Sequence, residues 1–297
     1  MLDIAIDRRN RDLGGFEVGR LLPHAQRRMV GPFIFFDHLS RVTFPRGVSR
    51  SVDVRPHPHI GLSTVTYLFE GEIVHRDSVG SEQPIRPGEV NWMIAGRGIT
   101  HSERFEKARA EGGSVHGIQS WVALPQADEE TDPGFAHHGE SDLPILDSEG
   151  IRIRLIAGRA FGMEARVKVH SPLFYASVEL ANGTSIELPA GFPERAAYIV
   201  SGGVKSDGRN FHDGRLLVFK AGGQPAVTAD GATTLMVLGG ETIGPRYIEW
   251  NFVSSSKERI EQAKADWRTG RMKLPDHDNS EFIPLPPDPP PAVNATS

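Results

Sequence analysis

The sequence predicts an all-β protein made of two tandem β-barrels followed by a C-terminal helix. Short apolar or alternating runs recur between turns, and the 32 glycines and 22 prolines among 297 residues favour short strands over long helices. The second half repeats the first in outline, since residues 198–203 resemble residues 67–72 and residues 213–219 resemble residues 87–93. A chain of this length is near the size at which a single core stops growing, so two domains are expected.

The first barrel is expected over residues 1–130. Residues 63–69 are rich in β-branched and aromatic side chains, which is typical of a buried strand. Glycine-containing turns follow at residues 70–72 and 96–98. Further strands are expected at residues 73–77, 90–94, 99–105 and 115–124. The spacing of these strands and turns is typical of a small antiparallel barrel.

The rest of the chain is expected to divide into a connection at residues 131–148, a second barrel at residues 149–250, and a helix with a proline-rich tail at residues 251–297. Within the tail, residues 284–291 are mostly proline, which predicts an extended segment lying over the surface.

The C-terminal helix has recognisable start and stop signals. Ser255, with Glu258 three residues later, forms a capping-box pattern, so a helix is expected from about residue 256 to residue 269. Gly270 can close this helix. One helical face would carry the apolar side chains of Ile260, Ala263 and Trp267.

The composition excludes several kinds of site and partner. Because the chain has no cysteine, it has no disulfides, thiol nucleophiles or thiolate ligands, and any metal must be held by histidine and carboxylate. A net charge of −5 gives no reason to expect nucleic-acid binding. Neither an export signal nor a run of about 20 apolar residues is found, so a soluble cytoplasmic protein without membrane contact is expected.

Two short polar motifs are candidate metal ligands. In His57-Pro58-His59 and in His101-Ser102-Glu103 the outer residues are two positions apart, so on a strand they point to one face. The prolines around His57 hold the first motif extended. The stretch between the motifs has room for about two or three antiparallel strands. The four outer side chains can therefore converge on one point.

The surroundings of the second motif indicate an inward-facing site. His101 and Glu103 share a strand face with the apolar Ile99 and Phe105, and buried polar groups require a partner, so a ligand is implied. Neutral imidazoles and one carboxylate would leave coordination positions open for chemistry. The remaining histidines are expected at the surface or in hydrogen bonds; among them are His24, His75, His116, His137, His138, His170 and His212. The repeat places Leu188, Ala190, Val227 and Ala229 at the equivalent positions of the second barrel, which should therefore bind no metal.

These motifs resemble those of the pirin family, which belongs to the cupin superfamily. The resemblance is carried by Gln26–Phe33 (QRRMVGPF), Phe36-Asp37-His38, Arg55–Leu62 (RPHPHIGL) and Gly96–Glu103 (GRGITHSE), and it is strongest over residues 16–125. It implies two tandem cupin (jelly-roll-like) barrels, a metal that is most often iron, and the ligands His57, His59, His101 and Glu103. The chain departs from the general cupin motif, because Ser63 and Thr64 stand where many cupins place a glutamate ligand. Glu103 would supply the carboxylate instead, as in pirins.

The resemblance also implies an activity. Some bacterial pirins are similar to quercetin 2,3-dioxygenases, which use O₂ to open the central ring of a flavonol. A small aromatic substrate would then bind one divalent metal, Fe(II) first, with Mn, Cu, Ni, Co or Zn as alternatives. The metal would bind the substrate's 3-hydroxyl as an oxyanion, and Glu103 would double as the catalytic base. Phe33, Phe36 and Trp92 are candidates either for the walls of the substrate pocket or for the core.

A second reading is not enzymatic. Animal pirins resemble iron-dependent regulators of transcription factors, so the metal could instead control a surface that binds a protein partner. Apart from the proline-rich tail, the sequence marks no such surface. In either reading a monomer is expected.

Overall fold

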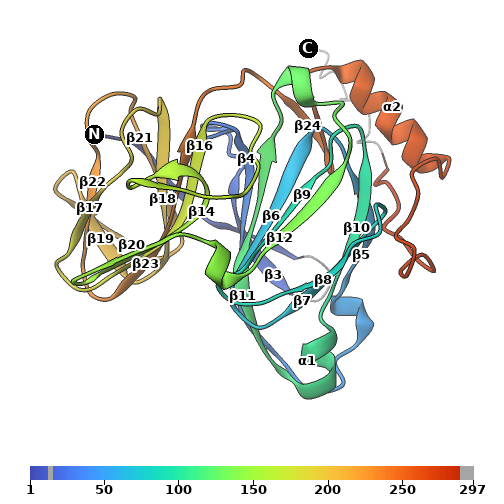
Figure 1. Cartoon of the computed structure of the whole chain (residues 1–297), viewed down its shortest axis with the longest axis horizontal. Coiled ribbons are helices and arrows are strands. Elements are labelled where there is room, and N and C mark those ends of the chain that lie inside the picture. Colours follow the sequence, from blue (N-terminus) through green and yellow to red (C-terminus); the bar gives the residue numbers. More distant parts are fainter. Residues whose placement is uncertain (13–15, 288–297) are drawn as a thin grey trace, which may run out of the picture.

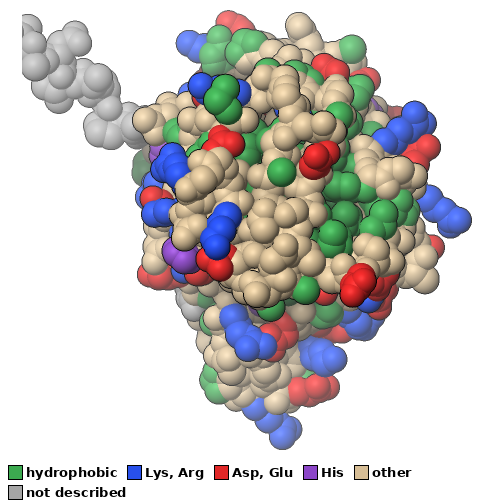
Figure 2. Space-filling view, turned by 90° about the vertical axis from the view of Figure 1, so that its left-hand side faces the viewer, with side chains coloured by type: hydrophobic (Ala, Val, Ile, Leu, Met, Phe, Trp, Pro, Cys, Tyr) green, Lys and Arg blue, Asp and Glu red, His purple; other side chains and the backbone are tan. Residues whose placement is uncertain are grey.

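The computed structural model describes residues 1–12 and 16–287. Within them the chain forms two barrels side by side, each with one large and one small β-sheet (Figure 1). The all-β fold with two tandem barrels is thus confirmed. Figure 2 views the second barrel from its outer side, where basic and acidic side chains are interspersed with hydrophobic ones. None of the described helices is long and apolar enough to cross a lipid bilayer.

The first barrel consists of a seven-stranded and a four-stranded antiparallel sheet. The large sheet runs in the order β12 (Gly134–His138), β9 (Val90–Ile94), β6 (Leu62–Glu70), β11 (Gly113–Ala123), β4 (Phe33–Phe44), β3 (Glu17–Leu22) and β2 (Arg9–Asp12). The small sheet runs in the order β5 (Val54–His59), β10 (Ile99–Arg104), β7 (Ile73–Asp77) and β8 (Glu82–Ile85). The strands β6 to β9 lie between the two ligand motifs, more than the two or three expected. A short helix, α1 (Glu106–Glu111), follows β10.

The second barrel repeats this plan. Its large sheet contains β1 (Leu2–Asp7), β21 (Arg215–Phe219), β18 (Glu194–Ser201), β23 (Thr233–Gly240), β16 (Leu173–Leu180), β14 (Ile151–Ala160) and β13 (Ile145–Ser148), and β15 (Met163–Glu164) pairs with β14. Its small sheet contains β17 (Ser185–Glu187), β22 (Ala226–Ala229), β19 (Gly203–Ser206) and β20 (Arg209–His212). Leu188, Val227 and Ala229, at the positions equivalent to ligands, lie in this barrel's apolar core, while Ala190 is exposed.

Two strands belong to a different domain from the one that the expected domain boundaries assign to them. The N-terminal strand β1 leaves its neighbours in sequence and pairs with β21 of the second barrel. Strand β12, in the expected connection, pairs with β9 and extends the first barrel's large sheet. Strand pairing, which is not local in sequence, decides the membership of both segments.

The two large sheets pack against each other and bury one shared apolar core. It includes Phe33, Phe36 and Trp92 from the first barrel and Tyr175 and Tyr198 from the second. Phe36 meets Tyr198 with ring centroids 5.3 Å apart. Burial of so many large rings stabilises the contact between the barrels.

After the second barrel the chain returns to the first. Strands β24 (Tyr247–Glu249) and β25 (Phe252–Ser254) form a hairpin, and α2 (Lys257–Arg268) follows. The predicted face of Ile260, Ala263 and Trp267 is buried, as expected. The predicted cap is wrong by one residue, since the Ser256 hydroxyl accepts from the Arg259 N–H.

Ser255 instead binds Glu129, because its N–H and hydroxyl both donate to that carboxylate. Of the proline-rich segment, residues 284–287 are described and have no regular secondary structure, whereas residues 288–291 lie outside the described residues.

Candidate metal centre

Strands β5 and β10 bring three histidines together on the inner face of the first barrel. On β5, His57 and His59 are two residues apart and point to the same face. On β10, His101 lies opposite His57 in the antiparallel register. Ligand nitrogens of the three imidazoles lie within 4.8 Å of one another, and all three residues are buried. The predicted convergence of the two motifs is therefore present for the histidines.

Backbone carbonyls set the tautomers of the first two rings. Nδ1 of His57 lies 2.9 Å from the carbonyl oxygen of Arg55, and Nδ1 of His59 lies 3.1 Å from that of Asn251. Because a carbonyl oxygen can only accept, Nδ1 carries the proton in both rings and Nε2 keeps a free lone pair. The second carbonyl comes from the hairpin β24–β25, so the returning C-terminal segment helps to orient the site.

The third ring also has a free Nε2. Nδ1 of His101 lies 3.3 Å from Nδ1 of His75, and Nε2 of His101 is buried without a hydrogen-bond partner in the described part of the chain. A buried polar atom without a partner is costly, so this nitrogen fits a site for a bound ion. Burial lowers the pKa of His57 to about 4 and holds the pKa values of His59 and His101 well below 6.5. At neutral pH the three rings are thus uncharged donors, the form that a divalent transition metal requires.

Glu103 follows two residues after His101 on the same strand face. Its carboxylate lines the cavity beside the histidines, but it is not in the 4.8 Å group of ligand atoms found among the described residues. Burial raises the pKa of Glu103 to about 7, although a hydrogen bond from Thr66 acts in the opposite direction. The structure places Glu103 on the wall of the same cavity as His57 and His59, and its role as a fourth ligand stays a prediction.

A cavity of about 920 Å³ opens between the two sheets of the first barrel. His57, His59 and Glu103 line it, so the candidate site faces a space large enough for an aromatic substrate. Phe35 and Trp121 form one wall, with stacked rings whose centroids are 4.0 Å apart. The edge-on contact of Trp121 with His59, at 5.0 Å between centroids, joins this aromatic wall to the three histidines.

Of the two alternatives for Phe33, Phe36 and Trp92, pocket wall or core, the structure supports the core, because none of them lines the cavity. These side chains point to the opposite face of the large sheet and lie in the core shared by the barrels. Phe35, between them in sequence, points into the cavity because neighbouring strand residues alternate. Strand β4 contains a bulge at Ile34, because Trp121 of β11 pairs with Phe35 while the next residue, Val122, pairs with Phe33. The extra residue lets Phe33 and Phe36 share a face.

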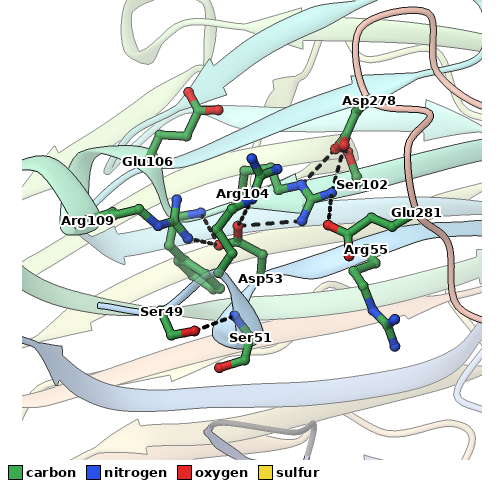
Figure 3. A network of polar contacts seen from close by, with 12 residues as sticks. Ser49, Ser51, Asp53, Arg55, Ser102, Arg104, Glu106, Arg109, Asp278 and Glu281 are labelled. Carbon is green, nitrogen blue, oxygen red and sulfur yellow. Dashed lines mark hydrogen bonds and ion pairs between the residues drawn. The ribbon is translucent and has the colours of Figure 1, made fainter. Parts of the chain in front are cut away.

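The segment after α2, residues 273–283, crosses the small sheet and forms another wall; we call it the strap. While His101 and Glu103 on β10 face inward, the alternate residues Thr100, Ser102 and Arg104 all bind the strap. Figure 3 shows Ser102 and Arg104 meeting Asp278 of the strap. Arg104 is fully buried and donates to both carboxylate oxygens of Asp278, each at 2.7 Å. Glu281 and Ile283 of the strap line the cavity. The sequence motifs gave no sign of this wall.

Comparison with known proteins identifies the family. The model of the family described as Pirin matches residues 15–122, and that of the Pirin C-terminal cupin domain matches residues 175–273. A pirin-like protein from Caulobacter vibrioides is 60% identical over 287 residues, which cover 96% of this chain and 100% of that protein.

Solved structures agree with this assignment. A quercetin 2,3-dioxygenase from Acinetobacter baumannii is 31% identical, has a TM-score of 0.86, and the match covers 96% of both chains. The bacterial pirin YhhW from Escherichia coli, solved in complex with nickel(II), is 16% identical with a TM-score of 0.64; the match covers 80% of this chain and 99% of YhhW. The second likeness concerns the fold alone. The chain belongs to the pirin family, and its two barrels are cupin domains.

Proposed function

We propose that this pirin is a metal-dependent dioxygenase of the quercetin 2,3-dioxygenase type, acting with O₂ on a flavonol or a similar enolic aromatic compound. The observation that carries the proposal is the convergence of three neutral imidazoles on the wall of an aromatic-lined cavity of about 920 Å³. The similarity to the Acinetobacter baumannii quercetin 2,3-dioxygenase over nearly the whole chain supports the same activity.

The metal would be held by His57, His59, His101 and Glu103. A donor set of imidazoles and one carboxylate suits Fe(II), Mn, Co, Ni, Cu or Zn, and O₂ chemistry favours a redox-active ion, Fe(II) first. A bound ion of this kind supplies Lewis acidity toward an enolic oxygen and one-electron chemistry for O₂.

The protein's own groups bind the substrate and move its proton. The stacked rings of Phe35 and Trp121 offer a flat apolar surface against which a planar substrate can lie. A carboxylate oxygen of Glu103 accepts the proton of the enolic hydroxyl and so acts as the general base. The apolar walls exclude water from the reacting ring.

Oxygen uptake is the direct test. Protein loaded with Fe(II) should consume O₂ with quercetin and abolish the flavonol's long-wavelength absorbance. Glu103→Gln should lower kcat by about 100-fold or more, because a positioned base contributes at least that factor. Glu129→Gln, which alters a buried carboxylate that does not line the cavity, should keep the activity. A metal-loaded protein that consumes no O₂ would refute the enzyme and favour the non-enzymatic regulator with a protein partner.

A further inference from the structure

A buried chain of hydrogen bonds leads from His101 away from the cavity. Nδ1 of His101 lies 3.3 Å from Nδ1 of His75, and Nε2 of His75 lies 2.9 Å from a carboxylate oxygen of Asp77. The exposed fractions of the three residues are 1%, 5% and 1%. Nothing in the proposed reaction uses His75 or Asp77. A buried carboxylate is costly unless it is hydrogen-bonded, and the chain satisfies this requirement for Asp77.

The strand register holds the chain in place. Across β10 and β7, His101 lies opposite Asp77 and Glu103 lies opposite His75, so all four residues share the inner face. The second carboxylate oxygen of Asp77 accepts the N–H groups of Val79 at 3.0 Å and Ser81 at 2.9 Å. His75 also stacks on Phe135, with ring centroids 4.4 Å apart and planes 16° apart. Neither side chain is therefore free to turn away.

The contact with Asp77 and the need for a free ligand nitrogen on His101 together set the direction of both hydrogen bonds. An ionised Asp77 only accepts, so Nε2 of His75 carries a proton and donates it to the carboxylate. A metal ligand needs the lone pair of Nε2 in His101, so Nδ1 of His101 carries the proton and donates it to Nδ1 of His75. Nε2 of His101, which is buried without a hydrogen-bond partner among the described residues, is then left free for a metal.

The three candidate ligands differ in what supports them. His57 and His59 donate to neutral backbone carbonyls, whereas His101 is connected through one ring to a carboxylate. We propose that Asp77 and His75 are positioning residues of the metal centre, which hold His101 in its binding tautomer and pass negative charge to it. The extra charge favours the more highly charged ion, Fe(III) over Fe(II). This inference rests on the proposed metal site.

Two variants break the chain at different points. His75→Phe keeps a ring over Phe135 but removes the acceptor for His101, and Asp77→Asn removes the charge with little change in shape. Each should weaken metal binding by about 10- to 100-fold, as is typical when a group supporting a ligand is lost. Chelator competition with Zn(II), Fe(II) and Fe(III) measures this loss. A tenfold greater loss for Fe(III) than for Fe(II) corresponds to a rise of about 59 mV in the reduction potential.

Controls separate this role from general stability. Glu129→Gln alters another buried carboxylate, held by Arg246 and Ser254, and should leave metal affinity and potential unchanged. NMR of metal-free protein should show slowly exchanging ring N–H protons on His101 and His75, and His75→Phe should abolish that of His101.

The outcomes are distinguishable. Unchanged metal affinities in both variants would overturn the inference, as would an equal loss in Glu129→Gln or a wild-type protein without the protected ring protons. Wild-type protein that binds no metal would remove the proposed function and this inference together. Metal-binding wild-type protein with unaffected variants would remove the inference alone.

Discussion

Removing Asp278 should weaken the attachment of the strap to the first barrel. The change leaves the Arg104 guanidinium buried without its two 2.7 Å bonds, and it removes the partner of the Ser102 hydroxyl at 2.6 Å. Loss of one partner from a buried ion pair costs about 3–5 kcal/mol. Because Arg104 keeps Glu281 at 3.1 Å and a longer contact with Asp53 at 3.5 Å, we expect Asp278→Ala to cost about 3 kcal/mol.

The assay is urea unfolding, with limited trypsin digestion at Lys273 to report release of the strap. The matched control is Asp276→Ala, since Asp276 pairs with Lys273 at 2.8 Å but both side chains are more than half exposed. The control should cost less than about 0.5 kcal/mol. Equal stabilities of the two variants would refute the reasoning.

The same pair predicts a dependence on pH. Burial alone would raise the pKa of Asp278, but hydrogen bonds from Arg104 and Ser102 outweigh it and hold the pKa below its usual value. The unfolded chain therefore takes up this proton first as the pH falls. The contribution of Asp278 should be complete above about pH 4 and should disappear as the pH falls through the lowered pKa.

Two further predictions concern the cavity wall and the contact between the barrels. Trp121→Ala should raise KM for the flavonol about tenfold, because about 1.4 kcal/mol of stacking energy is lost. The control Trp92→Phe should lower the melting temperature and leave KM unchanged. A similar rise in KM for both variants would contradict the assignment of the wall. Burial lowers the pKa of His38 from 6.5 to about 3. Between these two pH values His38 is protonated in the unfolded chain and neutral in the folded protein. The free energy of unfolding should therefore rise with pH between these values. In wild-type protein it should fall from pH 7 to pH 5, and His38→Gln should make this fall about 2 kcal/mol smaller, as measured by urea unfolding of the metal-free protein. An unchanged fall would show that His38 does not titrate in this way.

The histidine cluster could be predicted from the sequence because its geometry is local. A spacing of two residues fixes the strand face, and the prolines around His57 hold the strand extended, so only the pairing of β5 with β10 had to be assumed. The aromatic wall could not be predicted in the same way. Residues on both faces of β4 are apolar, since one face lines the cavity and the other meets the second barrel, so alternation separates Phe35 from Phe36 without saying which faces the cavity.

The features that the sequence did not predict depend on residues far apart in the chain. Arg104 and Asp278 are 174 positions apart, and no local pattern links them. Glu129 takes both donors of Ser255 from 126 positions away, which moves the helix cap to Ser256. His75 is expected at the surface or in a hydrogen bond, and it is buried and bonded to Asp77. Its place beside His101 follows only from the register of β7 with β10.

Metal content is the most direct test of the central claim that these histidines form a metal site. Elemental analysis of the purified wild-type protein should find about one transition-metal ion per chain. The double variant His57→Ala with His101→Ala should be folded and essentially metal-free, because two of the three converging donors are gone. Wild-type protein without a transition metal, or a double variant that keeps its metal, would contradict the account.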